Sequence, residues 1–135
     1  MKPWLSSLCL CFAVAASSPA LAQSGRYPVK TDCDTVRTVN PKAHASWYGS
    51  RFHGRQTANG ETFNMYALTA AHKTLALGSH ILVENVANGA RLVLRVNDRG
   101  PYVQGRNLDV SRRAADILGF REEGLAKVKI SLCAK

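Results

Sequence analysis

The sequence predicts a small, mainly β domain that closes into a barrel and carries one or two short helices. Short stretches in which apolar and polar residues alternate recur along the chain, and turn signals rich in Gly, Asn and Pro separate them. One segment, residues 111–119, has the spacing of a clear helix. Many short strands with one clear helix are typical of a small barrel rather than of a sheet with crossover helices.

The first 22 residues have the composition of a secretory signal peptide. Lys2 supplies the positive start, LCLCFAVAA the apolar core, and Ala20-Leu21-Ala22 the small-x-small cleavage site. This apolar run is too short for a membrane helix. Cys9 and Cys11 lie inside it, which is not the position of a lipid-bearing cysteine. We therefore expect a soluble protein, periplasmic or secreted, without stable membrane insertion.

Cleavage after Ala22 would leave 113 of the 135 residues, which suits one compact domain. Only Cys33 and Cys133 would remain, and a pair of cysteines in an oxidising compartment indicates a disulfide; the alternative is two buried free thiols. Closing a loop of about 100 residues stabilises a fold by up to about 4.7 kcal/mol in the chain-entropy model.

The chain is basic, with 18 Lys and Arg against 9 Asp and Glu. Lys2 is removed with the signal peptide, so the mature charge is +8. An exported basic domain without a nucleic-acid motif is better matched to an anionic polymer of the cell wall than to DNA or RNA. A merely solvated basic face is the alternative.

The organisation of the chain follows from its turn signals. Residues 23–42 are polar, contain two prolines and show no periodicity, so they predict an extended leader, with the domain over residues 43–135. The run SRFHGRQTANGETFNM after Gly49 predicts a long functional loop. Residues 65–74 are ambiguous between helix and strand.

The second half of the chain carries the clearest local signals. Residues 79–86 and 90–97 flank Ala87-Asn88-Gly89, and Asn-Gly between apolar runs predicts a hairpin. Ser111 is a suitable N-cap and Gly119 a suitable end for the helix. Residues 126–132 alternate between apolar and polar, as a final strand does.

Candidate functional residues are spread over separate segments, as active-site residues commonly are. Three acids and an imidazole stand out: Glu61, Asp98, Asp109 and His72. Arg99 directly follows Asp98. Salt bridging is the alternative for the acids, and a buried core histidine is the alternative for His72. Aromatic rings on which a sugar could stack are Trp47, Tyr48, Tyr66 and Tyr102, with core packing the alternative for Trp47.

No metal or cofactor is expected. The four histidines lack the tight spacing of a zincin helix or a zinc finger. The sequence also contains neither a G-x-S-x-G elbow nor a phosphate loop, so nucleophilic serine chemistry is unsupported.

Residues 45–120 carry the motifs W-Y-G, F-H-G-R-x-T-A-N-G-E, L-T-A-A-H-K-T-L, V-N-D-R-G-P and L-D-V-S in this order. This region resembles the domain of the rare lipoprotein A family, the septal lytic transglycosylases of bacteria. The resemblance implies a six-stranded double-psi β-barrel. It also implies cleavage of peptidoglycan glycan strands, with preference for strands stripped of stem peptides, to leave 1,6-anhydro-muramic ends.

The resemblance assigns catalytic roles to Glu61, His72 and Asp98. One carboxylic acid would protonate the glycosidic oxygen and then take the proton of the C6 hydroxyl as this hydroxyl attacks C1, with the other groups orienting the sugar or tuning the acid. Asp98 is placed first as that acid because its motif matches the functional position of the family. Asp109 is the second candidate, because its L-D-V-S motif resembles the F-D-L-S acid of expansins. It ranks below Asp98 because it precedes the helix and has a credible structural role at the helix start.

We expect Trp47, Tyr48, Arg99 and Asp109 to contact a substrate, and we expect a monomer that binds peptidoglycan without a cofactor. An expansin-like module that binds or loosens the wall without cutting it is the main alternative function. A third possibility is an exported effector or inhibitor-type barrel.

Overall fold

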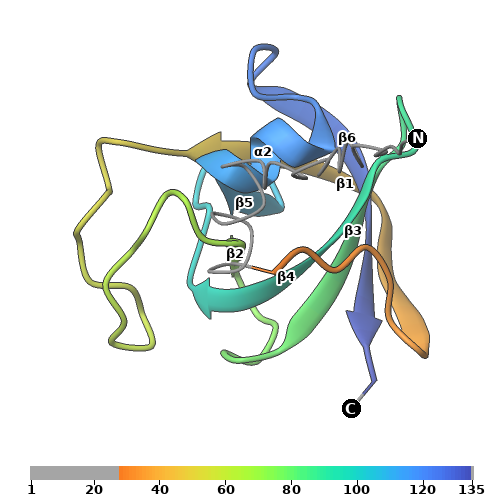
Figure 1. The fold of residues 1–135 in the computed structure, drawn as a ribbon, viewed down its shortest axis with the longest axis horizontal. Coiled ribbons are helices and arrows are strands. Elements are labelled where there is room, and N and C mark those ends of the chain that lie inside the picture. The colour runs from red at the N-terminus through yellow and green to blue at the C-terminus, as the bar shows by residue number, and fades with distance from the viewer. Residues whose placement is uncertain (1–27, 135) are drawn as a thin grey trace, which may run out of the picture.

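The computed structural model describes residues 28–134, so the predicted signal peptide lies outside the described residues. Six strands form a closed barrel in the order β1-β5-β2-β4-β3-β6 (Figure 1). Pairs β1·β5 and β2·β4 are parallel and the other four are antiparallel. The predicted six-stranded barrel is confirmed. The strands are β1 (Val36–Tyr48), β2 (Thr69–His72), β3 (His80–Asn85), β4 (Arg91–Asp98), β5 (Leu108–Ser111) and β6 (Leu125–Cys133).

The barrel interior is filled by one apolar cluster to which every strand contributes. Residues at alternate positions of each strand point inward, as the pleat requires, and the helix adds Ala114, Ala115 and Leu118. Burying this much aliphatic surface is the main source of stability for a domain of this size. The largest fully buried side chains are Phe120, Ile81, Leu92, Leu94, Leu108, Leu118 and Ile130.

The hairpin and the helix form where the sequence predicts them. Strands β3 and β4 pair antiparallel around the Asn88-Gly89 turn, where Gly89 has φ 76°. Helix α2 (Arg112–Leu118) starts at Ser111, whose Oγ accepts a hydrogen bond from Ala114 N. It ends at Gly119, which has φ 80° and donates its N–H to two carbonyls of the last turn. The ambiguous stretch, residues 65–74, contains strand β2 and no helix.

The leader is shorter than the sequence suggested. β1 begins at Val36, inside the range predicted to be an extended leader, and it pairs with β6 from Val36 opposite Cys133 onward. The pairing register shifts twice before Ala43, and Pro41 lies within the second shift. A proline is tolerated at such an irregularity, because the missing N–H is not needed in the ladder there, but it breaks the alternation on which a sequence-based prediction depends.

Residues 28–35 cross the barrel surface and are fastened to it at three points. Lys30 O accepts a hydrogen bond from Val93 N at 2.7 Å, and Asp32 forms an ion pair with Arg91 at 3.0 Å. Cys33 and Cys133 form the predicted disulfide, with their Cα atoms 5.7 Å apart. This segment is the orange trace that passes in front of β3 and β4 in Figure 1. Within residues 28–134, no helix combines the length and apolar character needed to span a bilayer.

Candidate active site

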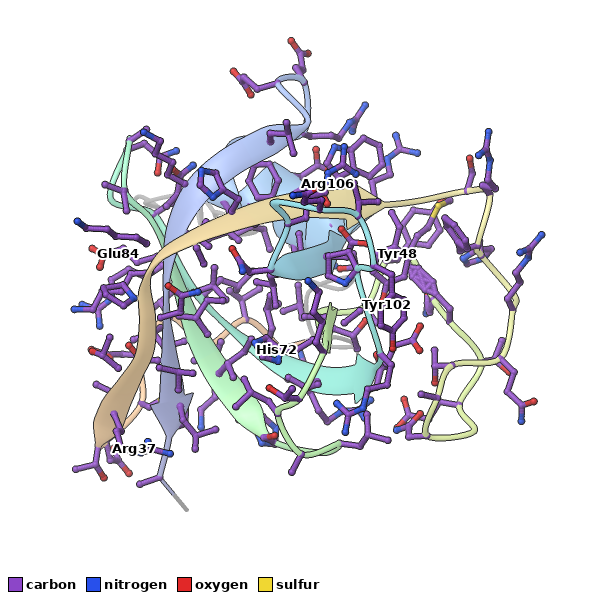
Figure 2. The ribbon with its side chains drawn as sticks, turned by 180° about the vertical axis from the view of Figure 1, so that it is seen from behind. Arg37, Tyr48, His72, Glu84, Tyr102 and Arg106 are labelled. Atoms are coloured by element: carbon purple, nitrogen blue, oxygen red, sulfur yellow. A yellow bond between two sulfur atoms is a disulfide. The ribbon has the colours of Figure 1, made fainter. Side chains whose placement is uncertain are left out.

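A cleft of about 280 Å³ lies on the outer face of the barrel, where β1, β2, β4 and β5 meet the long loop of residues 49–68. This loop extends away from the barrel at the left of Figure 1. Figure 2 shows Tyr48, Tyr102 and Arg106 toward the side from which the loop leaves, whereas Arg37 and Glu84 lie on the other side. Both predicted aspartates line the cleft, together with Tyr48, Phe63, Arg55 and Arg99.

Strand pairing brings the two aspartates to the same level of the sheet. Ala71 of β2 is the pairing partner both of Asp98 on β4 and of Asp109 on β5, and Asp109 in turn pairs with Ser46 on β1. Residues paired across strands project from the same face, and neighbouring strands lie about 4.8 Å apart. Asp98 and Asp109 therefore face the cleft from either side of Ala71, whose single methyl group leaves the space between the carboxyl groups open.

Asp98 is held in place by backbone donors. Its Oδ1 accepts hydrogen bonds from Ala58 N at 3.0 Å and from Arg99 N at 2.8 Å. Ala58 belongs to the long loop, so the position of this carboxyl group depends on how the loop is anchored.

Asp109 lies in a more enclosed environment. Its Oδ1 accepts a hydrogen bond from the Ser46 hydroxyl, which is buried. Burial raises the pKa of Asp109 above its ordinary value; the Ser46 hydrogen bond and the charge of Arg106 oppose this rise, and the charge of Asp98 adds to it. Asp109 is thus the carboxyl group of the cleft that keeps its proton more readily than an ordinary aspartate does.

The raised pKa of Asp109 predicts a pH-dependent gain in stability for Asp109→Asn. An acid whose pKa is higher in the folded than in the unfolded protein stabilises the fold while it is protonated, and this contribution is lost as the pH rises through the folded-state pKa. Asn cannot ionise, so the variant does not lose stability in this way as the pH rises. We expect the melting temperature of the variant to rise relative to that of the wild type between acidic and neutral pH, as measured by thermal unfolding. A difference independent of pH would contradict the raised pKa.

Glu61 anchors the loop and does not line the cleft. Arg95 Nη1 and Nη2 donate to its two carboxylate oxygens at 2.5 and 2.8 Å, and Asn59 Nδ2 donates at 2.8 Å. Chiefly because of the Arg95 hydrogen bonds, the pKa of Glu61 falls to about 2. The backbone carbonyl of Glu61 also accepts a hydrogen bond from the N–H of Thr57, the residue directly before Ala58. This geometry makes Glu61 an anchor that presents Ala58 N to Asp98 rather than a proton donor.

For Glu61→Gln the lowered pKa predicts the opposite pH dependence. The wild-type contribution is present above the unfolded-state pKa of about 4.5 and is lost as the pH falls toward about 2. The variant should be less stable at neutral pH, by about 0.2 to 1 kcal/mol because the ion pair is partly exposed, and should converge with the wild type as the pH falls through about 2. Unfolding in urea at several pH values measures this, and Arg95→Gln should reproduce the loss. If Glu61→Gln and the wild type are equally stable at neutral pH, the Glu61–Arg95 pair does not anchor the loop.

His72, at the end of β2, also lies outside the cleft lining. Its Nδ1 accepts hydrogen bonds from Thr74 N and Leu75 N, both at 3.1 Å, so the neutral ring carries its proton on Nε2. Burial lowers the pKa of His72, and the charges of Arg99 and Lys73 lower it further. Arg99 Nη1 donates to the carbonyl oxygens of His72 and Leu75. His72 and Arg99 thus fix the turn after β2 beside Asp98.

The two neighbouring aromatic residues of β1 face opposite sides of the strand. Tyr48 lines the cleft and stacks on Phe63, with ring centroids 4.3 Å apart. Burial, reinforced by the charges of Asp98 and Asp109, raises the pKa of Tyr48 above its ordinary range, so the phenol stays protonated. Trp47 instead packs against the core, and its Nε1 donates to Arg121 O at 2.9 Å. Its position matches the core-packing alternative.

Sequence reasoning did not single out several residues that build the site. One of them is Ser46, which lies two positions before Tyr48 on β1 and so shares its face, a signal that was available from the alternation alone. Phe63, Arg95 and Asn97 could not be found in this way. Among residues 28–134, there is no group of three or more His, Cys, Asp or Glu side chains able to hold a metal ion.

Comparison with known proteins adds family evidence. A protein-family model described as lytic transglycolase matches residues 40–130. The endolytic peptidoglycan transglycosylase RlpA of Pseudomonas aeruginosa is 55% identical over 104 residues, which cover 77% of this chain and 29% of that protein. The enzyme of the same name from Neisseria meningitidis is 55% identical over 100 residues, which cover 74% and 42%. The chain therefore spans less than half the length of these relatives.

The fold is also found in a solved structure. An expansin from Clavibacter michiganensis superposes with a TM-score of 0.58 at 18% sequence identity, covering 72% of this chain and 52% of the expansin. At this identity the likeness is one of fold.

Proposed function

Because the chain belongs to the lytic transglycolase family, we propose that it is an endolytic transglycosylase that cleaves the glycan strands of peptidoglycan. The observation that supports this most directly is the convergence of Asp98 and Asp109 on one cleft, on either side of Ala71. Enzymes that break glycosidic bonds usually do so with two carboxyl groups that flank the bond.

The reaction needs one carboxyl group that gives up and recovers a proton. The acid protonates the oxygen that leaves C1 of the muramic residue, and the C1–O bond breaks through an oxocarbenium-like state. The C6 hydroxyl then attacks C1 and returns its proton to the acid, which forms the 1,6-anhydro ring. No water is consumed, and the carboxyl group ends protonated as it began.

We assign the proton transfers to Asp109. A carboxyl group with a raised pKa retains its proton closer to neutral pH, which is the requirement for a general acid. The motif resemblance favours Asp98 for this role, but it does not take account of the burial of Asp109 against Ser46. We assign to Asp98, oriented by two backbone N–H groups, the stabilisation of positive charge at C1.

Glu61 and His72 act through the geometry of the two loops beside Asp98. The Glu61–Arg95 pair anchors the loop whose Ala58 N–H reaches Asp98, and the Nδ1 of His72 accepts the N–H groups of the turn that follows β2. Tyr48, stacked on Phe63, offers a protonated hydroxyl in the wall of the same cleft. The disulfide fits a protein that works outside the cytoplasm, in the periplasm or after secretion.

Mass spectrometry of the products from purified, peptide-stripped glycan strands tests the proposal. We expect fragments that end in 1,6-anhydro-muramic acid. Fragments with reducing ends would instead indicate hydrolysis, and intact strands that remain bound to the protein would indicate a wall-binding module of the expansin kind.

A further inference from the structure

We propose that Arg55 binds the free lactyl carboxylate of a muramic residue and thereby selects glycan strands from which the stem peptides have been removed. This inference rests on the proposed function, because it assigns the preference for one form of the same substrate to one side chain of the cleft.

The backbone of Arg55 is held firmly within the long loop. Its N–H donates to Phe52 O at 3.0 Å, and its carbonyl accepts Phe63 N at 2.6 Å, so both arms of the loop contribute to its position. The guanidinium carbon lies 5.5 Å from the centre of the Phe52 ring, within the range of a cation–π contact. The side chain therefore lines the cleft from a defined direction.

The guanidinium group of Arg55 is not committed to a protein acceptor. Among residues 28–134 it has no carboxylate within ion-pair distance, and its contact is the face of the Phe52 ring. The nearby arginines differ in this respect. Arg99 donates to the carbonyls of His72 and Leu75, and Arg95 is paired with Glu61. Of the two arginines that line the cleft, Arg55 is thus the one whose guanidinium group makes no hydrogen bond to an acceptor among residues 28–134.

The charges of the cleft indicate which kind of ligand Arg55 can bind. The carboxylate of Asp98 would repel a negatively charged ligand, so an anionic group can settle beside it only where a cation compensates for the charge. A muramic residue without its stem peptide carries a carboxylate on the lactyl ether, whereas a residue with its peptide carries an uncharged amide at the same carbon. The planar guanidinium group matches the carboxylate with two parallel hydrogen bonds and cannot do so with the amide.

A pair of substrates that differ only in this charge tests the proposal. One is peptide-free strands, and the other is the same strands with the lactyl carboxylates converted to methylamides. We expect the wild-type protein to cleave the first with a kcat/KM about 10 to 100 times higher, the usual value of a charge-assisted hydrogen bond to a carboxylate. In Arg55→Gln this ratio should fall close to one, because only the rate on the carboxylate strands drops.

Arg51→Gln is the matched control, because Arg51 is an exposed arginine of the same loop that is not among the residues lining the cleft. Arg51→Gln should keep the wild-type ratio of kcat/KM between the two strand types. A wild-type ratio near one, an unchanged ratio in Arg55→Gln, or an equal loss in both arginine variants would overturn the assignment. Binding of the two strand types to the three proteins, each also carrying Asp109→Asn so that the strands are not cleaved, gives the same comparison without turnover when measured by calorimetry. If binding discriminates in this way but the wild type releases no product, the proposed reaction is refuted and the role of Arg55 stands.

Discussion

Replacing Asp109 with Asn is expected to slow the formation of anhydro-ended products by a factor of about 10² to 10⁴, the usual contribution of a general acid. Asn keeps the shape of the side chain and can still accept the Ser46 hydrogen bond, but it cannot donate and recover a proton. The variant should remain folded, and the alkaline limb of the kcat/KM profile should disappear, because that limb reports ionisation of the acid. Initial rates on peptide-stripped strands across a pH series measure both effects.

Asp98→Asn separates the two carboxyl groups. It should also lower the rate, by about 10² to 10³, because the oxocarbenium-like state loses a facing negative charge. The alkaline limb should nevertheless persist, since the acid is intact. If instead Asp98→Asn removes that limb and Asp109→Asn retains it, the roles are the reverse of our assignment. Two fully active variants would remove both carboxyl groups from the mechanism.

The second large effect is expected when the disulfide is removed. In the double variant Cys33→Ser, Cys133→Ser the free energy of unfolding should fall by up to about 4.7 kcal/mol, because the bridge joins residues 100 apart and restricts the unfolded chain accordingly. Unfolding in urea gives this free energy from the midpoint and the slope.

Reduction provides the control for that measurement. Treating the wild type with dithiothreitol should lower its stability to about that of the double variant, whereas the double variant should not respond. If the oxidised and reduced wild-type proteins unfold at the same urea concentration, the bridge makes no contribution to stability.

Local signals predicted much of the fold because the information lies in adjacent residues. Asn88-Gly89 specifies a turn between two alternating strands, and Ser111 and Gly119 supply the start and end that a helix needs. The disulfide followed from cysteine number and compartment alone. These features do not depend on how distant segments meet.

The arrangement of the site could not be predicted in this way, because it depends on distant pairings. The ion pair of Glu61 with Arg95 joins residues 34 apart, and the hydrogen bond of Ser46 to Asp109 joins residues 63 apart. Motifs identified Glu61 as functional, but the structure was needed to find it paired outside the cleft. Likewise, Trp47 and Tyr48 are equivalent in sequence until the barrel decides which face of β1 is its interior.

The segment of residues 28–35 also covers part of one strand edge of the barrel. β4 has eight residues and its parallel neighbour β2 only four, so the first half of β4 extends past β2 on that side. An uncovered strand edge is a template on which another chain can add a strand. Lys30 occupies this edge by accepting the N–H of Val93, and the ion pair of Asp32 with Arg91 places two charges beside it. The disulfide at Cys33 therefore holds in place the segment that covers this edge of β4.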